Sequence, residues 1–134
     1  MRYLGLKLNK VSAEKFKEPS KGEIKVNSNF NLGSAEKEKT PSDLKNPVFG
    51  FNFNYSLEYG DSARIEFNGV VYLELSDPKV IKEIEKTKKT MDDNLKKAIL
   101  EIVFARTHVE SLHLEEKLGL PFHIQSPRVT LKEE

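Results

Sequence analysis

The sequence predicts an α+β domain, in which a four-stranded antiparallel sheet is followed by two C-terminal helices packed on one face. Three observations lead to this fold class. Apolar and polar side chains alternate over long stretches before residue 76, which is the pattern of strands with one wet face. After Ser76 the period becomes helical. A chain of 134 residues fits one domain, so we expect a single domain over residues 1–134.

The longest regular alternation runs from Val48 to Leu75. Large apolar residues occupy every second position from Phe49 to Tyr59, and asparagine, serine and glutamate fill most of the positions between them. After Gly60-Asp61-Ser62 the alternation resumes. This pattern predicts a long antiparallel hairpin with one aromatic face and one polar face.

Two further strands precede the hairpin. Leucines alternate with other residues from Leu4 to Leu8, and then the phase slips so that Val11 and Ala13 carry the apolar side. A slip of one residue indicates a bulge, which we place near Asn9-Lys10. A second alternation runs from Ile24 to Leu32, and the polar composition from Gly33 to Pro47 is typical of a mobile loop.

Two helices are expected after the hairpin. Ser76-Asp77-Pro78 is a helix start, since Asp can cap free amides and Pro is tolerated in the first turn. A second helix is predicted from about Leu95 to Leu118, ended by Gly119 and Pro121. The first helix is amphipathic, with an apolar side formed by Val80, Ile81, Ile84 and Met91.

The first half of the second helix is apolar around most of its circumference, from Ala98 to Ala105. A helix of this kind needs burial on more than one side, and one sheet covers only one side. We therefore expect a homo-oligomer, either a dimer or a tetramer, with Ile99, Ile102 and Val103 at the interface.

The composition excludes several classes of protein. Acidic and basic residues nearly balance to a net charge of +1, which gives no field that favours nucleic acid or an anionic membrane. Cysteine is absent, which removes disulfides and cysteine nucleophiles. No apolar run approaches the roughly 20 residues that cross a bilayer. We expect a cytoplasmic protein that does not insert into membranes.

No catalytic or metal-binding pattern is present. His108 and His113 are five residues apart, whereas two ligands on one helical face need a spacing of three or four. His123 lies between two apolar residues and is expected to form a local hydrogen bond. Neither G-x-S-x-G nor S-x-x-K occurs. We predict a protein without catalytic activity, metal or cofactor.

The order of the elements resembles the SecB family of protein-export chaperones. Three segments carry this resemblance along the whole chain: the hairpin run Glu66–Leu73, Phe104-Ala105-Arg106 in the long helix, and Gly119-Leu120-Pro121 followed by residues 124–129. The helix lacks the Cys-Pro segment that the family carries before its aromatic-Ala-Arg. The resemblance implies a dimer or dimer of dimers that holds unfolded polypeptides in apolar grooves without ATP, for protein export or beside a toxin and antitoxin.

The resemblance also bears on partner docking. In the family, an acidic patch on the open sheet face engages the translocation motor, and Glu14 and Glu66 match two of its positions. Lys10 stands where the family has an aspartate, and Arg64 stands where it has an apolar residue. Two positive charges weaken the attraction for a basic partner, so motor docking is doubtful.

Candidate peptide-binding residues are apolar side chains in irregular segments, namely Phe16, Leu44, Phe122 and Ile124. The alternative is that all four fold inward. A second hypothesis from another class is a small-ligand binding domain with a cavity between the sheet and the helix. A third, an enzyme, remains only because a site that relies on its substrate leaves no motif.

Overall fold

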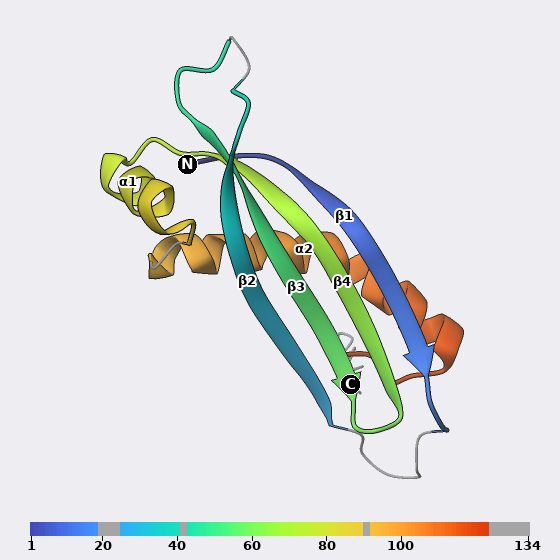
Figure 1. Ribbon diagram of the computed structural model, residues 1–134. Helices are drawn as coiled ribbons and strands as arrows, with labels where there is room; N and C mark the ends of the chain where they lie inside the picture. Colours follow the sequence, from blue (N-terminus) through green and yellow to red (C-terminus); the bar gives the residue numbers. More distant parts are fainter. Residues whose placement is uncertain (19–24, 41–42, 90–91, 124–134) are drawn as a thin grey trace, which may run out of the picture.

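The computed structural model describes residues 1–18, 25–40, 43–89 and 92–123, and it confirms the α+β fold class (Figure 1). Four strands form one sheet in the order β1-β4-β3-β2, and all neighbouring strands are antiparallel. Two helices follow in the chain. The elements are β1 (Arg2–Lys15), β2 (Val26–Glu38), β3 (Val48–Tyr59), β4 (Ala63–Glu74), α1 (Pro78–Thr87) and α2 (Asp93–Leu118).

The predicted hairpin is formed by β3 and β4, with Val48 opposite Glu74 and Tyr59 opposite Ala63 beside the turn. Every second side chain from Phe49 to Tyr59 is at most 4% exposed. The aromatic face is therefore packed core, while the other face of the hairpin is open to water (Figure 1).

The bulge predicted in β1 is confirmed, because the pairing with β4 shifts between Leu8 and Lys10. A second shift, between Tyr3 and Gly5, was not predicted. Gly69 lies opposite Leu8, where a Cβ atom would be only 2.3 Å from the carbonyl oxygen of Lys7. Glycine at this position is what lets the two strands approach so closely.

The predicted loop from Gly33 to Pro47 is wrong in its first part, because β2 continues to Glu38. The pairing with β3 shifts between Leu32 and Ala35 and then resumes with Ala35 opposite Phe51. The neighbouring strand β3 supplies the apolar partners for this half of β2, so a polar composition does not prevent pairing there.

Helix α1 begins as predicted, with the Asp77 carboxylate accepting a hydrogen bond from the backbone N–H of Lys79 at 3.0 Å. Ile84 is buried in the core, and the predicted partner Met91 lies outside the described residues. The backbone N–H of Ala35 donates to the carbonyl oxygen of Lys88, just after α1, at 2.7 Å. This hydrogen bond attaches the end of α1 to the outer edge of β2.

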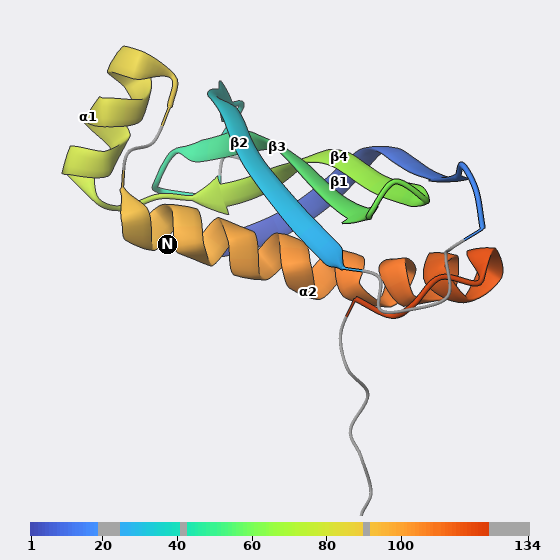
Figure 2. The same cartoon turned by 90° about the horizontal axis from the view of Figure 1, so that it is seen from below.

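Helix α2 crosses the aromatic face of the sheet (Figure 2). It begins after the cap Asp92 and ends before Gly119, which takes a left-handed φ of 65°. The buried positions recur every fourth residue, so the buried stripe moves about 40° around the helix at each step. Its members are Leu95, Ile99, Val103, Thr107, Ser111 and Glu115.

Candidate functional site

A buried polar cluster joins the end of β3 to α2 and to the segment that follows α2. The Tyr59 hydroxyl donates to Oε2 of Glu115 at 2.5 Å, and the backbone N–H of His123 donates to the same oxygen at 2.7 Å. The other oxygen, Oε1, lies 2.8 Å from Nδ1 of His123. Glu115 is 0% exposed, so these contacts compensate a carboxylate that has lost its water. We call Tyr59, Glu115 and His123 the buried cluster.

The surroundings of the buried cluster favour a structural role. Burial raises the pKa of Tyr59 above its ordinary value of 10.0, and the hydrogen bond to Glu115 raises it further. Burial and the Glu115 charge also raise the pKa of Tyr55. Both hydroxyls therefore keep their protons near neutral pH. A tyrosine held protonated can donate a hydrogen bond but cannot act as a base.

The segment after α2 folds back along the helix. The backbone N–H of Leu120 donates to the carbonyl oxygen of Glu115 at 2.9 Å, and Leu120 is 6% exposed. The His123 ring meets the His108 ring edge-on at 5.5 Å between centroids, and His108 stacks on Phe104 at 5.7 Å. His123 thus forms a hydrogen bond, as the sequence predicted, but its partner is not local, since Glu115 lies eight residues earlier on α2.

The histidines do not gather into a metal site. Among the described residues, no group of three or more His, Cys, Asp or Glu side chains is arranged to hold a metal ion. His108 and His123 instead contact each other through their rings, and His123 uses Nδ1 for Glu115.

A groove of about 350 Å³ lies where α2 meets the segment after it. Val109 is 57% exposed and Phe122 is 50% exposed, although both are apolar. We call this the distal groove, and its lining residues are Val109, Leu112, His113, Glu116 and Phe122. Exposed apolar side chains gathered in this way make the distal groove a candidate interaction surface.

A second groove, of about 410 Å³, runs between β2 and the start of α2. Its apolar wall is made by Phe30, Leu32 and Leu100, and Leu100 is 38% exposed. We call it the edge groove, because β2 is an outer strand of the sheet. Its full lining is Phe30, Asn31, Leu32, Gly33, Lys89, Lys96, Lys97 and Leu100.

The structure brings two of the predicted peptide-binding residues to the same end of the sheet. Phe16 follows β1, is 58% exposed and donates its backbone N–H to Ser62 at 2.6 Å. Phe122 belongs to the segment after Gly119, and Gly119 lies beside the Lys15 ammonium group. Leu44 is half-buried before β3, roughly 40 Å from that end if β3 rises about 3.3 Å per residue. Ile124 lies outside the described residues.

The predicted interface residues divide between core and surface. Ile99 and Val103 are 0% exposed and pack into the core of a single chain, while Ile102 is half-buried against it. The placement of Ile99 and Val103 on a contact surface is therefore corrected, because their side chains are already covered. On α2, the exposed large apolar side chains are instead Leu100, Phe104 and Val109, which are 38%, 39% and 57% exposed.

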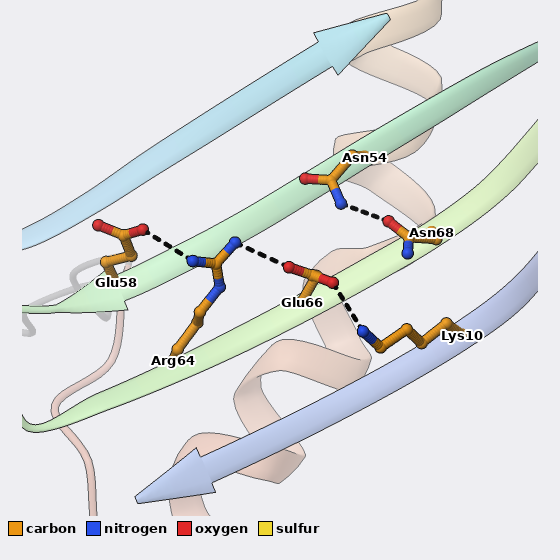
Figure 3. A network of polar contacts seen from close by, with 6 residues as sticks. All are labelled: Lys10, Asn54, Glu58, Arg64, Glu66 and Asn68. Carbon is orange, nitrogen blue, oxygen red and sulfur yellow. Dashed lines mark hydrogen bonds and ion pairs between the residues drawn. The ribbon is translucent and has the colours of Figure 1, made fainter. Parts of the chain in front are cut away.

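The open face of the sheet carries a chain of ion pairs rather than a bare acidic patch (Figure 3). Glu66 binds Lys10 Nζ at 3.0 Å and Arg64 Nη2 at 2.7 Å, and Arg64 also reaches Glu58 at 3.3 Å. The hydrogen bond from Lys10 holds the pKa of Glu66 below its ordinary value, with Arg64 contributing. Glu14, the other predicted docking residue, is exposed and lies opposite Arg64 in the sheet.

Sequence reasoning missed Glu115 and the lysines of the edge groove. Glu115 continues the series of every fourth residue to which Ile99 and Val103 belong. This spacing is the signal that places Glu115 on the buried side of α2. The edge groove had no local signal, because its walls come from β2 and α2, which are distant in the chain.

The architecture defines a class of fold: four antiparallel strands in the order β1-β4-β3-β2, with two helices after them, as in SecB-like chaperones. One solved structure with this fold is the SecB-like chaperone Rv1957 of Mycobacterium tuberculosis, in complex with a ChAD peptide from the Rv1956 HigA1 antitoxin. The alignment covers 93% of this chain and 85% of that chain, with 11% sequence identity and a TM-score of 0.51. The fold expected from the SecB resemblance is thereby confirmed.

No family model and no curated protein matches this sequence. Within the described residues, neither helix is long and apolar enough to cross a membrane.

Proposed function

We propose that this protein is an ATP-independent chaperone that binds unfolded or extended apolar segments of other polypeptides. The observation that carries the proposal is the exposure of Phe16, Val109 and Phe122, each at least half open to water. The last two line the distal groove. Apolar side chains gathered in this way favour association, because contact with another apolar chain removes them from water.

The fold comparison supports a polypeptide as the bound partner. Rv1957 was solved with a peptide from an antitoxin, and its backbone arrangement is similar to that of this chain. The interior offers less support for the small-ligand alternative, since Ile65, Phe67 and Val103 between the sheet and α2 are 0% exposed and pack into one core. Binding of this kind requires no cofactor, metal or chemical step.

We propose further that the protein works in the cytoplasm as a homo-oligomer, a dimer or a tetramer. Phe104 on α2 and Val11 on β1 provide apolar surface for a second copy. A single groove covers only a short segment of a client, and ordering that segment costs entropy. Several grooves on one oligomer acting together raise the affinity without any new kind of contact.

The open face bears on where a client is delivered. The charge of Glu66 is compensated by Lys10 and Arg64, which weakens attraction for a basic motor protein. This compensation favours a client from another system, such as a toxin and antitoxin pair, over delivery to a translocation motor.

The test is light scattering of a denatured protein diluted into buffer with and without this chaperone and without ATP. We expect a stoichiometric amount to suppress aggregation of several unrelated clients. The double variant with Phe122→Ser and Val109→Ser should suppress less, while sedimentation shows the same oligomer. A matched control is Leu4→Ser on β1, which removes an exposed apolar side chain outside the distal groove and outside the proposed contact with a second copy.

Aggregation that is unchanged across all clients would reject the proposal and bring the small-ligand alternative forward. Equal loss of aggregation suppression in the control and in the double variant would show that clients do not bind specifically in the distal groove. A monomer at micromolar concentration would contradict the proposed assembly.

A further inference from the structure

The edge groove lies along a strand that has room for another. β2 is the outer strand of the sheet, next to β3. At Ala35 its edge is closed by the hydrogen bond to the Lys88 carbonyl, and Lys37 is held by Glu85 of α1 at 3.5 Å. Before this closure, from Val26 to Leu32, no described strand pairs with the outer edge. An extended peptide can add there through its backbone.

The groove beside this edge combines apolar contacts with one sign of charge. Phe30, Leu32 and Leu100 form its apolar wall. Its charged lining consists of Lys89, Lys96 and Lys97, and among the described residues no acidic side chain lines it.

Several cations elsewhere on the surface are paired with carboxylates, whereas, among the described residues, the three lysines of the groove are not. Lys10, Lys17 and Arg64 each lie within 3.3 Å of a carboxylate oxygen. For the edge-groove lysines, no ion pair is found within the part of the chain that the structure describes. Two of them, Lys96 and Lys97, lie near the start of α2, where the helix macrodipole favours negative charge and where Asp92 and Asp93 precede them. The described lining of the groove therefore carries three positive charges in a chain whose net charge is only +1.

We propose that the edge groove binds extended polypeptide segments in which acidic residues alternate with apolar ones. In such a strand, side chains on one face meet Phe30, Leu32 and Leu100, while carboxylates reach the lysines at the rim. This inference rests on the proposed chaperone function and adds a charge preference to it. The class of client it predicts is acidic and apolar rather than basic.

The test uses three ten-residue peptides that carry leucine and valine at alternate positions and glutamate, glutamine or lysine between them. Fluorescence anisotropy measures their affinity for the full-length protein. We expect the glutamate peptide to bind about five- to tenfold more tightly than the lysine peptide, as two or three exposed ion pairs allow. This advantage should shrink as salt rises, since exposed charges are screened.

Charge reversal assigns the preference to the groove. The double variant with Lys96→Glu and Lys97→Glu should reverse the order of the peptides. The matched control reverses Lys82 and Lys86, which are exposed on α1 and change the net charge equally. A second variant, Lys89→Gln with Lys97→Gln, removes charge without adding any and guards against misfolding, which melting curves would detect.

Outcomes for the inference and for the chaperone function are distinguishable. Suppressed aggregation together with equal affinity for all three peptides would overturn the charge preference and leave the chaperone function standing. The inference also fails if the Lys82 and Lys86 control reverses the order as strongly as the groove variant. If the wild-type protein does not suppress aggregation at all, the chaperone function on which the inference rests is rejected instead.

Discussion

Two polar contacts in this protein have nearly the same length and opposite surroundings. The Tyr59 hydroxyl lies 2.5 Å from a Glu115 oxygen, and Lys17 Nζ lies 2.6 Å from an Asp61 oxygen. Glu115 is 0% exposed, whereas the side chains of Lys17 and Asp61 are 58% and 81% exposed. Water competes for the second contact and is excluded from the first. Distance therefore does not rank these contacts by stability, and burial does.

The ion pairs on the open face fall between these extremes. The Glu66 side chain is 15% exposed, while its partners Lys10 and Arg64 are 54% and 45% exposed. The comparison predicts a series of decreasing effects on folding stability, from the buried cluster through Glu66 to the Lys17 and Asp61 pair. Each step of the series can be measured by chemical denaturation.

The largest effect is expected for Glu115→Ala. The change leaves the Tyr59 hydroxyl and the His123 backbone N–H buried without an acceptor and opens a cavity. We expect the free energy of unfolding to fall by about 3 kcal/mol or more. Urea denaturation measures it, with Glu66→Ala as the partly exposed counterpart. Equal losses in the two variants would contradict the rule that burial sets the size of the effect.

A smaller loss, of about 1.5–2 kcal/mol, is expected for Tyr59→Phe, because it removes one hydrogen bond to a buried carboxylate. The ring remains, so core packing is preserved. Tyr72→Phe is the matched control on the open face, where no hydrogen bond to the hydroxyl is found among the described residues. A control loss as large as that at Tyr59 would assign the effect to the ring rather than to the hydrogen bond.

The same tyrosine makes stability fall in alkaline solution. Above pH 10 the unfolded Tyr59 loses its proton, whereas the folded residue keeps it because its pKa is raised. The unfolded state then binds fewer protons, so the unfolding free energy decreases with pH by up to about 1.4 kcal/mol per unit for this group. Between pH 9 and pH 11, the melting temperature should decrease less steeply with pH in Tyr59→Phe than in the wild type. Identical slopes in the two proteins would refute the assignment to Tyr59.

An effect of about 0.5 kcal/mol is expected for Lys10→Ala, which removes one partner of a half-exposed ion pair. The contribution of this ion pair to the unfolding free energy changes with pH in the opposite direction to that of Tyr59. Because the pKa of Glu66 is lowered, the pair stabilises the fold above the ordinary value of 4.5, and this stability is lost as the pH falls through the lowered pKa. Denaturation at pH 7 and pH 3 should show the wild type and variant converging in acid.

The smallest effect is expected at Lys17. Lys17→Ala should leave the denaturation midpoint unchanged, even though Lys17 Nζ and Asp61 Oδ2 are only 2.6 Å apart and the hydrogen bond lowers the pKa of Asp61. A measurable loss at physiological salt would show that this pair is shielded from water in solution.

Much of the fold follows from side-chain periods that the sequence displays directly. The alternation from Phe49 to Tyr59 and the cap at Asp77 gave the hairpin and the start of α1, because both depend on neighbouring residues. The continuation of β2 to Glu38 could not be predicted in this way. Its pairing depends on β3, and the register shift after Leu32 breaks the alternation.

The candidate site was less predictable, because its parts meet only in the folded chain. Phe122, predicted to bind peptides, is an exposed apolar residue, but the groove it lines depends on Val109 and Leu112 of α2. Ile99 and Val103 were assigned to the surface because the apolar circumference of α2 suggests two contact sides. The buried stripe winds around the helix instead, so part of that circumference is core.

The close approach at Gly69 has a consequence for folding kinetics. β3 and β4 meet across a short turn, so their hairpin can form from local contacts, whereas β1 must find β4 after the chain has passed through β2 and β3. The strands fit in one register, because a Cβ atom opposite the Lys7 carbonyl oxygen would lie 2.3 Å from it, and the neighbours of Gly69 both carry a Cβ atom. We expect docking of β1 to be slow for this reason. Until it occurs, the β4 edge is open to other chains, and the nascent protein carries an aggregation-prone edge of its own.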